Sequence, residues 1–170
     1  MIGILTSGFA QAAPRFVDVE IGWTYETFPL RIEIYEVKSD RSPYVSETGI
    51  ADKLKDMPIA TKIAGQKIKA GVGRSVAFVL LTENTTKEDV YFFAVPHELN
   101  PHHASAGHYF ECLCIGRLFK VPPGKFWYRI VRLSLNNTFK TLSGFKISHQ
   151  IIGVSRAEAL GKYKDQLYER

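Results

Sequence analysis

The sequence predicts an all-β protein, an antiparallel β-sandwich that ends in a C-terminal α-helix. Short segments with apolar residues at every second position recur along the 170-residue chain, and turn sequences separate them at fairly regular spacing. Aromatic residues, which favour strands, make up 12% of the composition. Alternation with a period of two places apolar side chains on one face of a strand, and such strands pack well as two facing sheets.

Seven or more short strands carry this pattern. Residues 17–23 and 30–34 alternate apolar and polar side chains, whereas residues 76–81 are continuously apolar, as in a strand buried on both faces. The other expected strands, in chain order, are residues 67–69, 90–95, 109–115, 127–135 and 145–151. Residues 39–56 are polar and rich in turn formers, so we expect a loop there with one helical turn at 50–54.

The end of the chain predicts its one helix, over residues 155–170. Ser155 is a good N-cap, and no proline interrupts the segment that follows. The apolar stripe expected on this helix consists of Ala157, Leu160, Tyr163 and Leu167. The domain plan is therefore a sandwich over residues 14–154 and a helix over 155–170.

The first 13 residues predict the remnant of an export signal or the tail of a membrane anchor. Residues 2–9 are apolar, and Ala10-Gln11-Ala12 has the small-residue pattern of a signal-peptidase site. We therefore expect an exported chain. A terminus that packs on the domain is the alternative.

Composition excludes several classes of function. Hydrophobic residues make up 45% and charged residues 23%, which suits a globular domain with a real core. The net charge is +5, but the basic residues are scattered without a run of five, so we expect no nucleic-acid partner. The sequence has no phosphate-binding glycine loop, nucleophile elbow or His-Glu-x-x-His motif, so we expect no enzymatic activity.

The most informative feature is the pair Cys112 and Cys114, the only cysteines of the chain. In a strand these residues present two thiols on one face. Soft thiolates close together select thiophilic ions, chiefly Cu(I) and Zn(II). A closed Zn(II) site needs four ligands, whereas a thiolate pair is sufficient for Cu(I), so Cu(I) is the expected ion.

Other interpretations of the cysteine pair stay open. A disulfide would join Cα atoms about 6.5 Å apart in an extended strand, close to the upper limit for such a bridge. Two buried thiols that merely pack in the core are another alternative. A thiol–disulfide protein that keeps copper ligands reduced is a third.

Four of the five histidines precede the cysteines within a short distance. His108 lies four residues before Cys112, on the same side of the predicted strand, and is expected as an auxiliary metal ligand. His97, His102 and His103 lie in a Pro-flanked loop and are expected to be solvated or hydrogen-bonded, with the alternative that the loop brings one of them to the site. His149 is expected as a satisfied core residue. A blue-copper site needs one Cys with two His, and no His follows the thiols at the usual spacing.

A longer motif surrounds the cysteines. Its parts are Asn100-Pro101, Ala106-Gly107-His108-Tyr109-Phe110, Cys112-Leu113-Cys114-Ile115, and Leu118 with Val121-Pro122-Pro123-Gly124-Lys125. This motif resembles the CtaG-type cytochrome c oxidase assembly proteins, whose pattern is an Asn/Thr-Pro, an Ala-Gly-x-Tyr-Phe, a Cys-Phe-Cys-Phe strand and a Leu-x-Pro-Gly-Glu turn. The likeness covers about residues 66–135, and the acidic-Gln pair after the family's cysteines is Gly116-Arg117 here.

The resemblance implies an immunoglobulin-like domain, membrane-anchored and facing the periplasm or the intermembrane space. Cys112 and Cys114 would carry Cu(I) for the copper centre of a haem-copper oxidase. We therefore expect a copper metallochaperone whose partner is a membrane oxidase or another copper enzyme, and a homodimer sharing copper is a further expected arrangement. The alternative function is a non-catalytic structural β-sandwich subunit of a larger membrane assembly.

Overall fold

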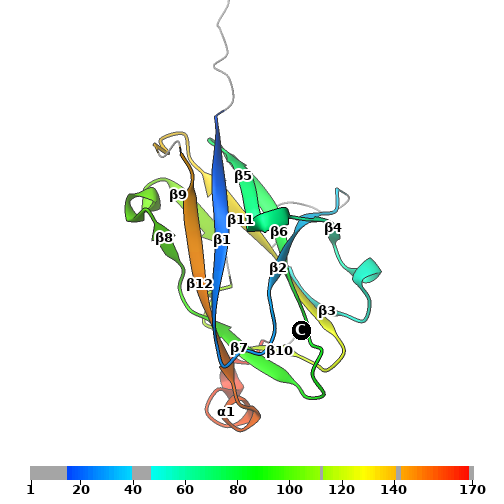
Figure 1. Cartoon of the computed structure of the whole chain (residues 1–170). Helices are drawn as coiled ribbons and strands as arrows, with labels where there is room; N and C mark the ends of the chain where they lie inside the picture. The colour runs from blue at the N-terminus through cyan, green and yellow to red at the C-terminus, as the bar shows by residue number, and fades with distance from the viewer. Residues whose placement is uncertain (1–14, 40–46, 112, 141–142, 169–170) are drawn as a thin grey trace, which may run out of the picture.

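Two β-sheets form the protein in a computed structural model that describes residues 15–39, 47–111, 113–140 and 143–168 (Figure 1). The first sheet follows the order β10-β7-β12-β1-β5, with β8 paired to β12: β10 (Phe119–Val121), β7 (Val90–Ala94), β12 (Phe145–Val154), β1 (Phe16–Glu26), β5 (Lys67–Gly71), β8 (Glu98–Asn100). The second follows β3-β11-β6-β2-β4, with β9 paired to β11: β3 (Thr48–Ala51), β11 (Phe126–Leu135), β6 (Arg74–Glu83), β2 (Glu33–Val37), β4 (Ile59–Lys62), β9 (His108–Glu111). The predicted β-sandwich is thus confirmed.

One strand pairing differs from the antiparallel prediction. β1 and β12 run parallel, with Val19 opposite Phe145 and Glu26 opposite Ile152, whereas the other paired strands of the described chain are antiparallel. A parallel pair cannot be joined by a tight hairpin. Here nearly the whole domain lies between the two strands, so the chain supplies the long connection that such a pair requires.

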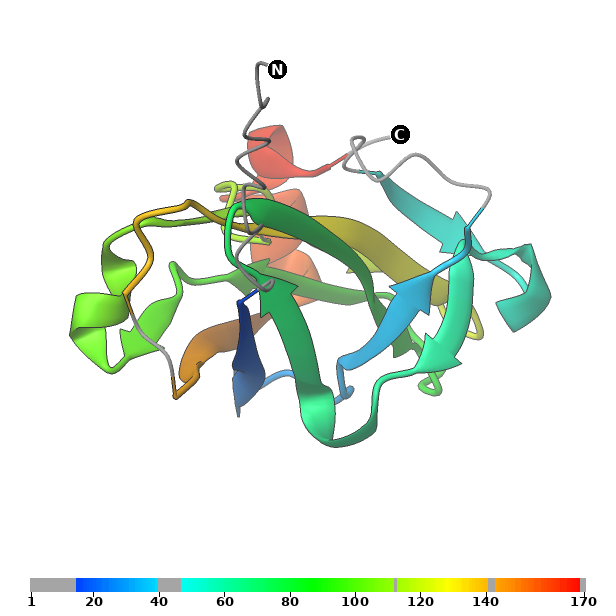
Figure 2. The ribbon, with the colours of Figure 1, turned by 90° about the horizontal axis from the view of Figure 1, so that it is seen from above.

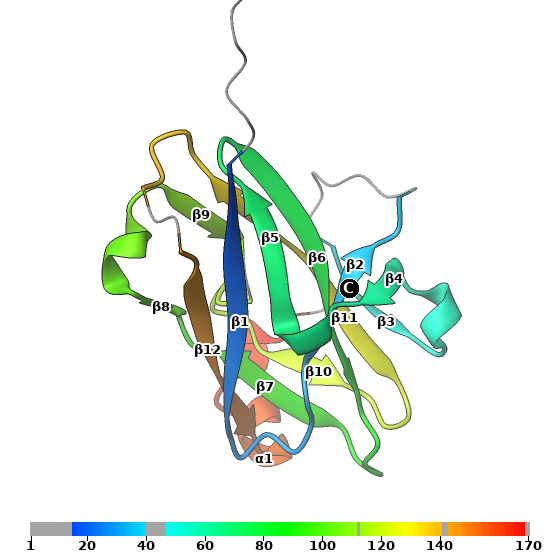
Figure 3. The same cartoon turned by 45° about the horizontal axis from the view of Figure 1, so that its top comes forward.

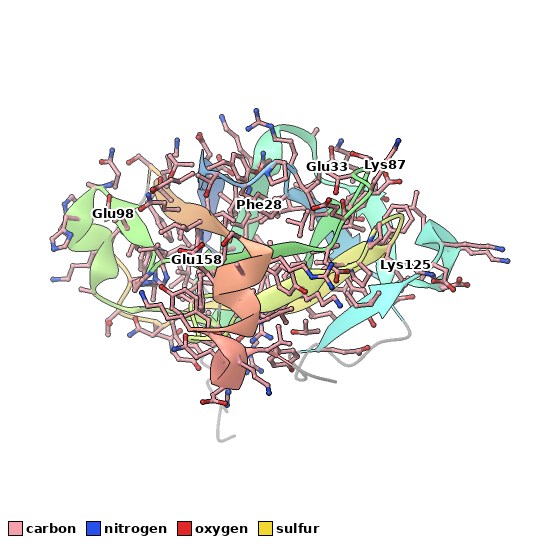
Figure 4. All side chains as sticks on the ribbon, turned by 90° about the horizontal axis from the view of Figure 1, so that it is seen from below. Phe28, Glu33, Lys87, Glu98, Lys125 and Glu158 are labelled. Carbon is pink, nitrogen blue, oxygen red and sulfur yellow. The ribbon has the colours of Figure 1, made fainter. Side chains whose placement is uncertain are left out.

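Aromatic side chains fill the space between the sheets. The rings of Phe92, Phe119 and Trp127 lie 5.1–5.2 Å apart between centroids, at the tilted and edge-to-face angles that aromatic rings prefer. Phe28 packs on Phe92 from the side of β1. In Figure 4, Phe28 lies between Glu98 at one end of the molecule and Lys125 at the other.

A second, smaller cluster covers the outer face of the β11 and β6 strands. Strand alternation sends Phe78 and Leu80 to the main core and Val79 and Leu81 to the opposite face. The segment between β3 and β4, which we call the strap (residues 51–59), closes over that face with Met57 only 1% exposed. In Figures 1 and 2 the strap lies at the end of the molecule opposite to β8.

The secondary structure of the strap differs from the loop with a helical turn that was predicted for this region. The expected helical turn at 50–54 is instead the end of β3 followed by a 3-10 turn, η1 (Leu54–Asp56). Further 3-10 turns are η2 (Ala64–Gln66) and η3 (His102–Ser105). Residues 50 and 51 pair with β11, and this tertiary pairing outweighs the local preference for a helix.

The C-terminal helix is shorter than predicted. α1 (Arg156–Leu160) begins with the expected Ser155 cap, in a capping box with Glu158, but ends before Gly161, and the 3-10 turn η4 (Lys164–Gln166) follows. Ala159 is the buried residue of α1 and Leu160 is 47% exposed, so the predicted stripe is wrong there. Beyond the turn, Leu167 bridges to Leu118 and the ring of Tyr168 packs on that of Phe119.

The predicted export signal or anchor, residues 1–13, lies outside the described residues. Among the helices that the structure does describe, none has the length and apolar character needed to cross a bilayer.

Replacing Met57 tests the role of the strap. We expect Met57→Ala to lower the free energy of unfolding by about 2–5 kcal/mol, because it removes a buried side chain and leaves a cavity. Leu54→Ala, in the same segment but 47% exposed, should change it by less than about 0.5 kcal/mol. Urea unfolding of both variants checks this, and equal effects would show that the strap does not seal a core.

Candidate metal centre

His149 is fixed in the core by the alternation of β12. Phe145, Ile147 and Ile151 of this strand face inward, so the residue between Ile147 and Ile151 at the same period must also face inward. His149 is 1% exposed, and within the described structure neither of its ring nitrogens has a hydrogen-bond partner. The predicted burial is confirmed, but the imidazole is not satisfied by hydrogen bonds.

The surroundings of His149 keep it neutral. Its ring lies 5.1 Å from that of Trp23, the residue opposite it on β1, and 5.6 Å from that of Phe110. Burial, and secondarily the charge of His97, lower the pKa of His149 from 6.5 to about 3. At neutral pH the imidazole therefore offers a lone pair, the form that binds metals.

His97 lies beside His149 because of an irregularity between β7 and β8. Ala94 pairs with Ile151 and Glu98 with Ser148, so three residues on one side oppose two on the other, which is a bulge. Pro96 lacks the N–H that a regular ladder needs there. The bulge turns His97 toward the core, where its ring is 5.4 Å from that of His149.

His97 is half-buried, and its Nδ1 lies within hydrogen-bonding distance of Cys114 Sγ, so of the two predicted states it is hydrogen-bonded rather than solvated. Its pKa is lowered, first by burial and then by the charge of His108. By contrast, His102 and His103 are exposed in η3, as predicted.

Cys114 approaches the two histidines from the other sheet. The predicted strand over residues 109–115 ends early, because β9 stops at Glu111 and Leu113 turns fully into the core. Cys114 is half-buried, and its Sγ lies 3.6 Å from Nδ1 of His97. Cys114 is disulfide-bonded, which supports the disulfide alternative, while Cys112 lies outside the described residues.

One ligand atom from each of His97, Cys114 and His149 falls within a sphere of metal-site size. The three atoms lie within 4.8 Å of one another. Two ligands on one ion, with metal–sulfur and metal–nitrogen bonds of about 2.3 and 2.0 Å, are separated by about 3.6–3.8 Å. The Cys114–His97 distance already matches that value, so small movements of His149 would complete a three-ligand site once the sulfur is reduced.

The cluster differs from the predicted ligand set. His108 is not among its three members, although its ring lies 5.9 Å from that of His97. Its two imidazoles come from positions distant in sequence, so the spacing of residues after the thiols does not reveal this one-cysteine, two-histidine cluster. His97 immediately precedes β8, His149 lies on β12 and Cys114 follows β9, and these three strands lie on the same side of the molecule (Figures 1 and 3).

Comparison with known proteins identifies a family whose function is unknown. A family model described as a domain of unknown function, DUF8709, matches residues 17–154. No curated protein and no solved structure matches the chain. The resemblance to CtaG-type assembly proteins therefore stays a prediction.

The depressed pKa of His149 predicts acid sensitivity in the metal-free protein. As pH falls below 6.5 the unfolded chain takes up a proton at this residue, while the folded protein does not until about pH 3, so stability is lost in that window. Between pH 7 and pH 4.5 the loss should be about 2–3 kcal/mol.

His149→Phe removes the titrating group and preserves an apolar ring of similar size. Its unfolding free energy should fall less over the same pH range, as measured by urea unfolding at each pH. An identical pH dependence in the two proteins would contradict the assigned neutral state.

Proposed function

This chain belongs to the DUF8709 family, and we propose that it binds Cu(I) through Cys114, His97 and His149 and carries the ion to a copper-receiving partner. The observation that carries the proposal is His149, a buried imidazole whose two nitrogens lack hydrogen-bond partners in the described structure and which adjoins a cysteine sulfur. A buried polar group without a partner is costly, and a bound ion is one of the few features that explain it.

The donor set favours Cu(I). One soft sulfur with two neutral imidazoles matches the ligand preference of copper. The described cluster supplies three ligand atoms, which is enough for Cu(I), whereas a structural Zn(II) site closes with four. Cys112 stays a predicted second thiolate. His108, the predicted auxiliary ligand, is not among the three members of the described cluster, so the proposed final site does not include it.

Copper binding requires the reduced protein. Breaking the disulfide of Cys114 takes two electrons and two protons, which two molecules of a small thiol, or one dithiol protein, supply as they form a disulfide. The Cys114 thiol then loses its proton when the metal binds. Oxidation of this sulfur would therefore release copper, which is a useful property in a carrier.

The destination of the copper follows from the resemblance alone. It implies a carrier in the periplasm or the intermembrane space, close to the membrane, with a haem-copper oxidase or another copper enzyme as the recipient. Transfer would be a ligand exchange without a change in oxidation state, in which recipient ligands replace those of the carrier one at a time. A homodimer sharing copper belongs to the same proposal.

A second candidate function is electron transfer. It is favoured by the cluster itself, because one cysteine and two histidines are the equatorial ligands of blue-copper sites. An intense visible thiolate-to-copper band on adding Cu(II), with reversible reduction, would support this function over carriage.

An anaerobic titration of reduced protein with Cu(I), against a competing chelator, tests the proposal. We expect tight binding that Cys114→Ser and His149→Phe each weaken by more than about 100-fold, since losing even a residue that only orients a ligand costs about 10–100-fold. The exposed His102→Ala is the control and should bind as the unaltered protein does.

Weak binding by the unaltered protein, or binding that survives both Cys114→Ser and His149→Phe, would contradict a copper site at this cluster. If His149→Phe still binds Cu(I) tightly but the double variant Cys112→Ser/Cys114→Ser does not, the thiols alone hold the copper.

A further inference from the structure

A groove opens beside the metal centre. It has a volume of about 690 Å³ and lies across the ends of β6, β9 and β11. Its lining includes Arg74, Ser75, His108, Ser134, Asn136 and Asn137. This volume falls within the range of small-molecule sites, about 300–1,000 Å³.

The groove has both polar and apolar surface, and the only charged side chain among its described lining residues is cationic. Among its described lining residues, Arg74 is exposed and carries a positive charge, and none is Asp or Glu. The hydroxyls of Ser75 and Ser134 lie 2.7 Å apart on neighbouring strands. A groove with this lining is complementary to a small polar molecule that carries negative charge.

Two glycines shape the groove. Gly73 and Gly107 have φ angles of +75° and +89°, which side-chain-bearing residues rarely adopt. A Cβ on Gly107 would lie 2.6 Å from Oδ1 of Asn136, and one on Gly73 would meet Asn137. The glycines thus allow both amide side chains to lie against the backbone in the groove wall.

His108 connects the groove to the metal centre. It lines the groove, and its ring packs edge-to-face on that of His97 at 5.9 Å. His97 in turn contacts the sulfur of Cys114 through Nδ1, at 3.6 Å. His108 contacts the three-residue cluster through His97 but is not a member of it. It can therefore bind an ion in transit without being a ligand of the final site.

We propose that a Cu(I) complex of a small anionic thiol docks in this groove and that His108 relays the ion to His97. The inference rests on the proposed function and adds the form in which copper arrives. The carrier's Cu–S bond breaks as a Cu–N bond to His108 forms, and that bond breaks as copper binds His97 and Cys114. The departing thiolate takes up the proton that the Cys114 thiol releases, and copper stays Cu(I) throughout.

Stopped-flow loading of reduced protein with the Cu(I) complex of glutathione, an anionic thiol tripeptide, tests this route. His108→Gln should load about tenfold more slowly, because the positioned intermediate ligand is lost, while its equilibrium affinity stays unchanged. Arg74→Gln should also load about tenfold more slowly from the anionic complex, yet at the normal rate from the cationic tetra-acetonitrile complex of Cu(I). His102→Ala should load at the normal rate.

Several results would overturn the proposal. A loss of equilibrium affinity in His108→Gln would make His108 a ligand of the final site. Normal loading of Arg74→Gln from the glutathione complex would exclude the groove as the docking site, even if His108→Gln fails to fold. Slow loading of unaltered protein from glutathione, with fast loading from a copper-bearing protein donor, would replace the small carrier with a protein. Failure of the unaltered protein to bind Cu(I) at equilibrium would instead contradict the proposed function.

Discussion

The pairing of β12 constrains the rest of the structure. This strand pairs with β1 along one edge and with β7 and β8 along the other, so it cannot slip or rotate without breaking three ladders. A shift of one residue would turn Phe145, Ile147 and Ile151 outward. The same register fixes His149 in the core, where its two nitrogens are unpaired in the described structure, so a cost in stability is built into the fold.

Three separate features bring ligands to that imidazole. A bulge at Pro96 turns His97 inward, the early end of β9 lets Leu113 enter the core, and Cys114 follows on the rim beside His97. The centre therefore joins the two sheets at one edge of the sandwich. A metal that binds both His149 and Cys114 would cross-link the sheets, so copper loading and stability are coupled.

Local patterns predicted the long strands well, because their side chains alternate or run continuously apolar, as in β1, β6, β11 and β12. Strands of three or four residues, such as β8 and β10, are too short to show a period and depend on their neighbours.

The metal site could be predicted only in part, for a related reason. The cysteine motif marked the region, but the approach of His97 and His149 depends on the pairing of distant segments. His149 resembled an ordinary core residue because only its missing hydrogen bonds distinguish it.

The central claim is that a buried imidazole and a cysteine sulfur bind one copper ion. X-ray absorption spectroscopy of the reduced protein loaded with Cu(I) tests it directly, because imidazole and sulfur ligands scatter differently. We expect a Cu(I) edge with sulfur and imidazole nitrogen in the same coordination sphere, and a loss of imidazole scattering in His149→Phe. A sphere of sulfur alone, unchanged by His149→Phe, would contradict it and leave the histidines as packing residues.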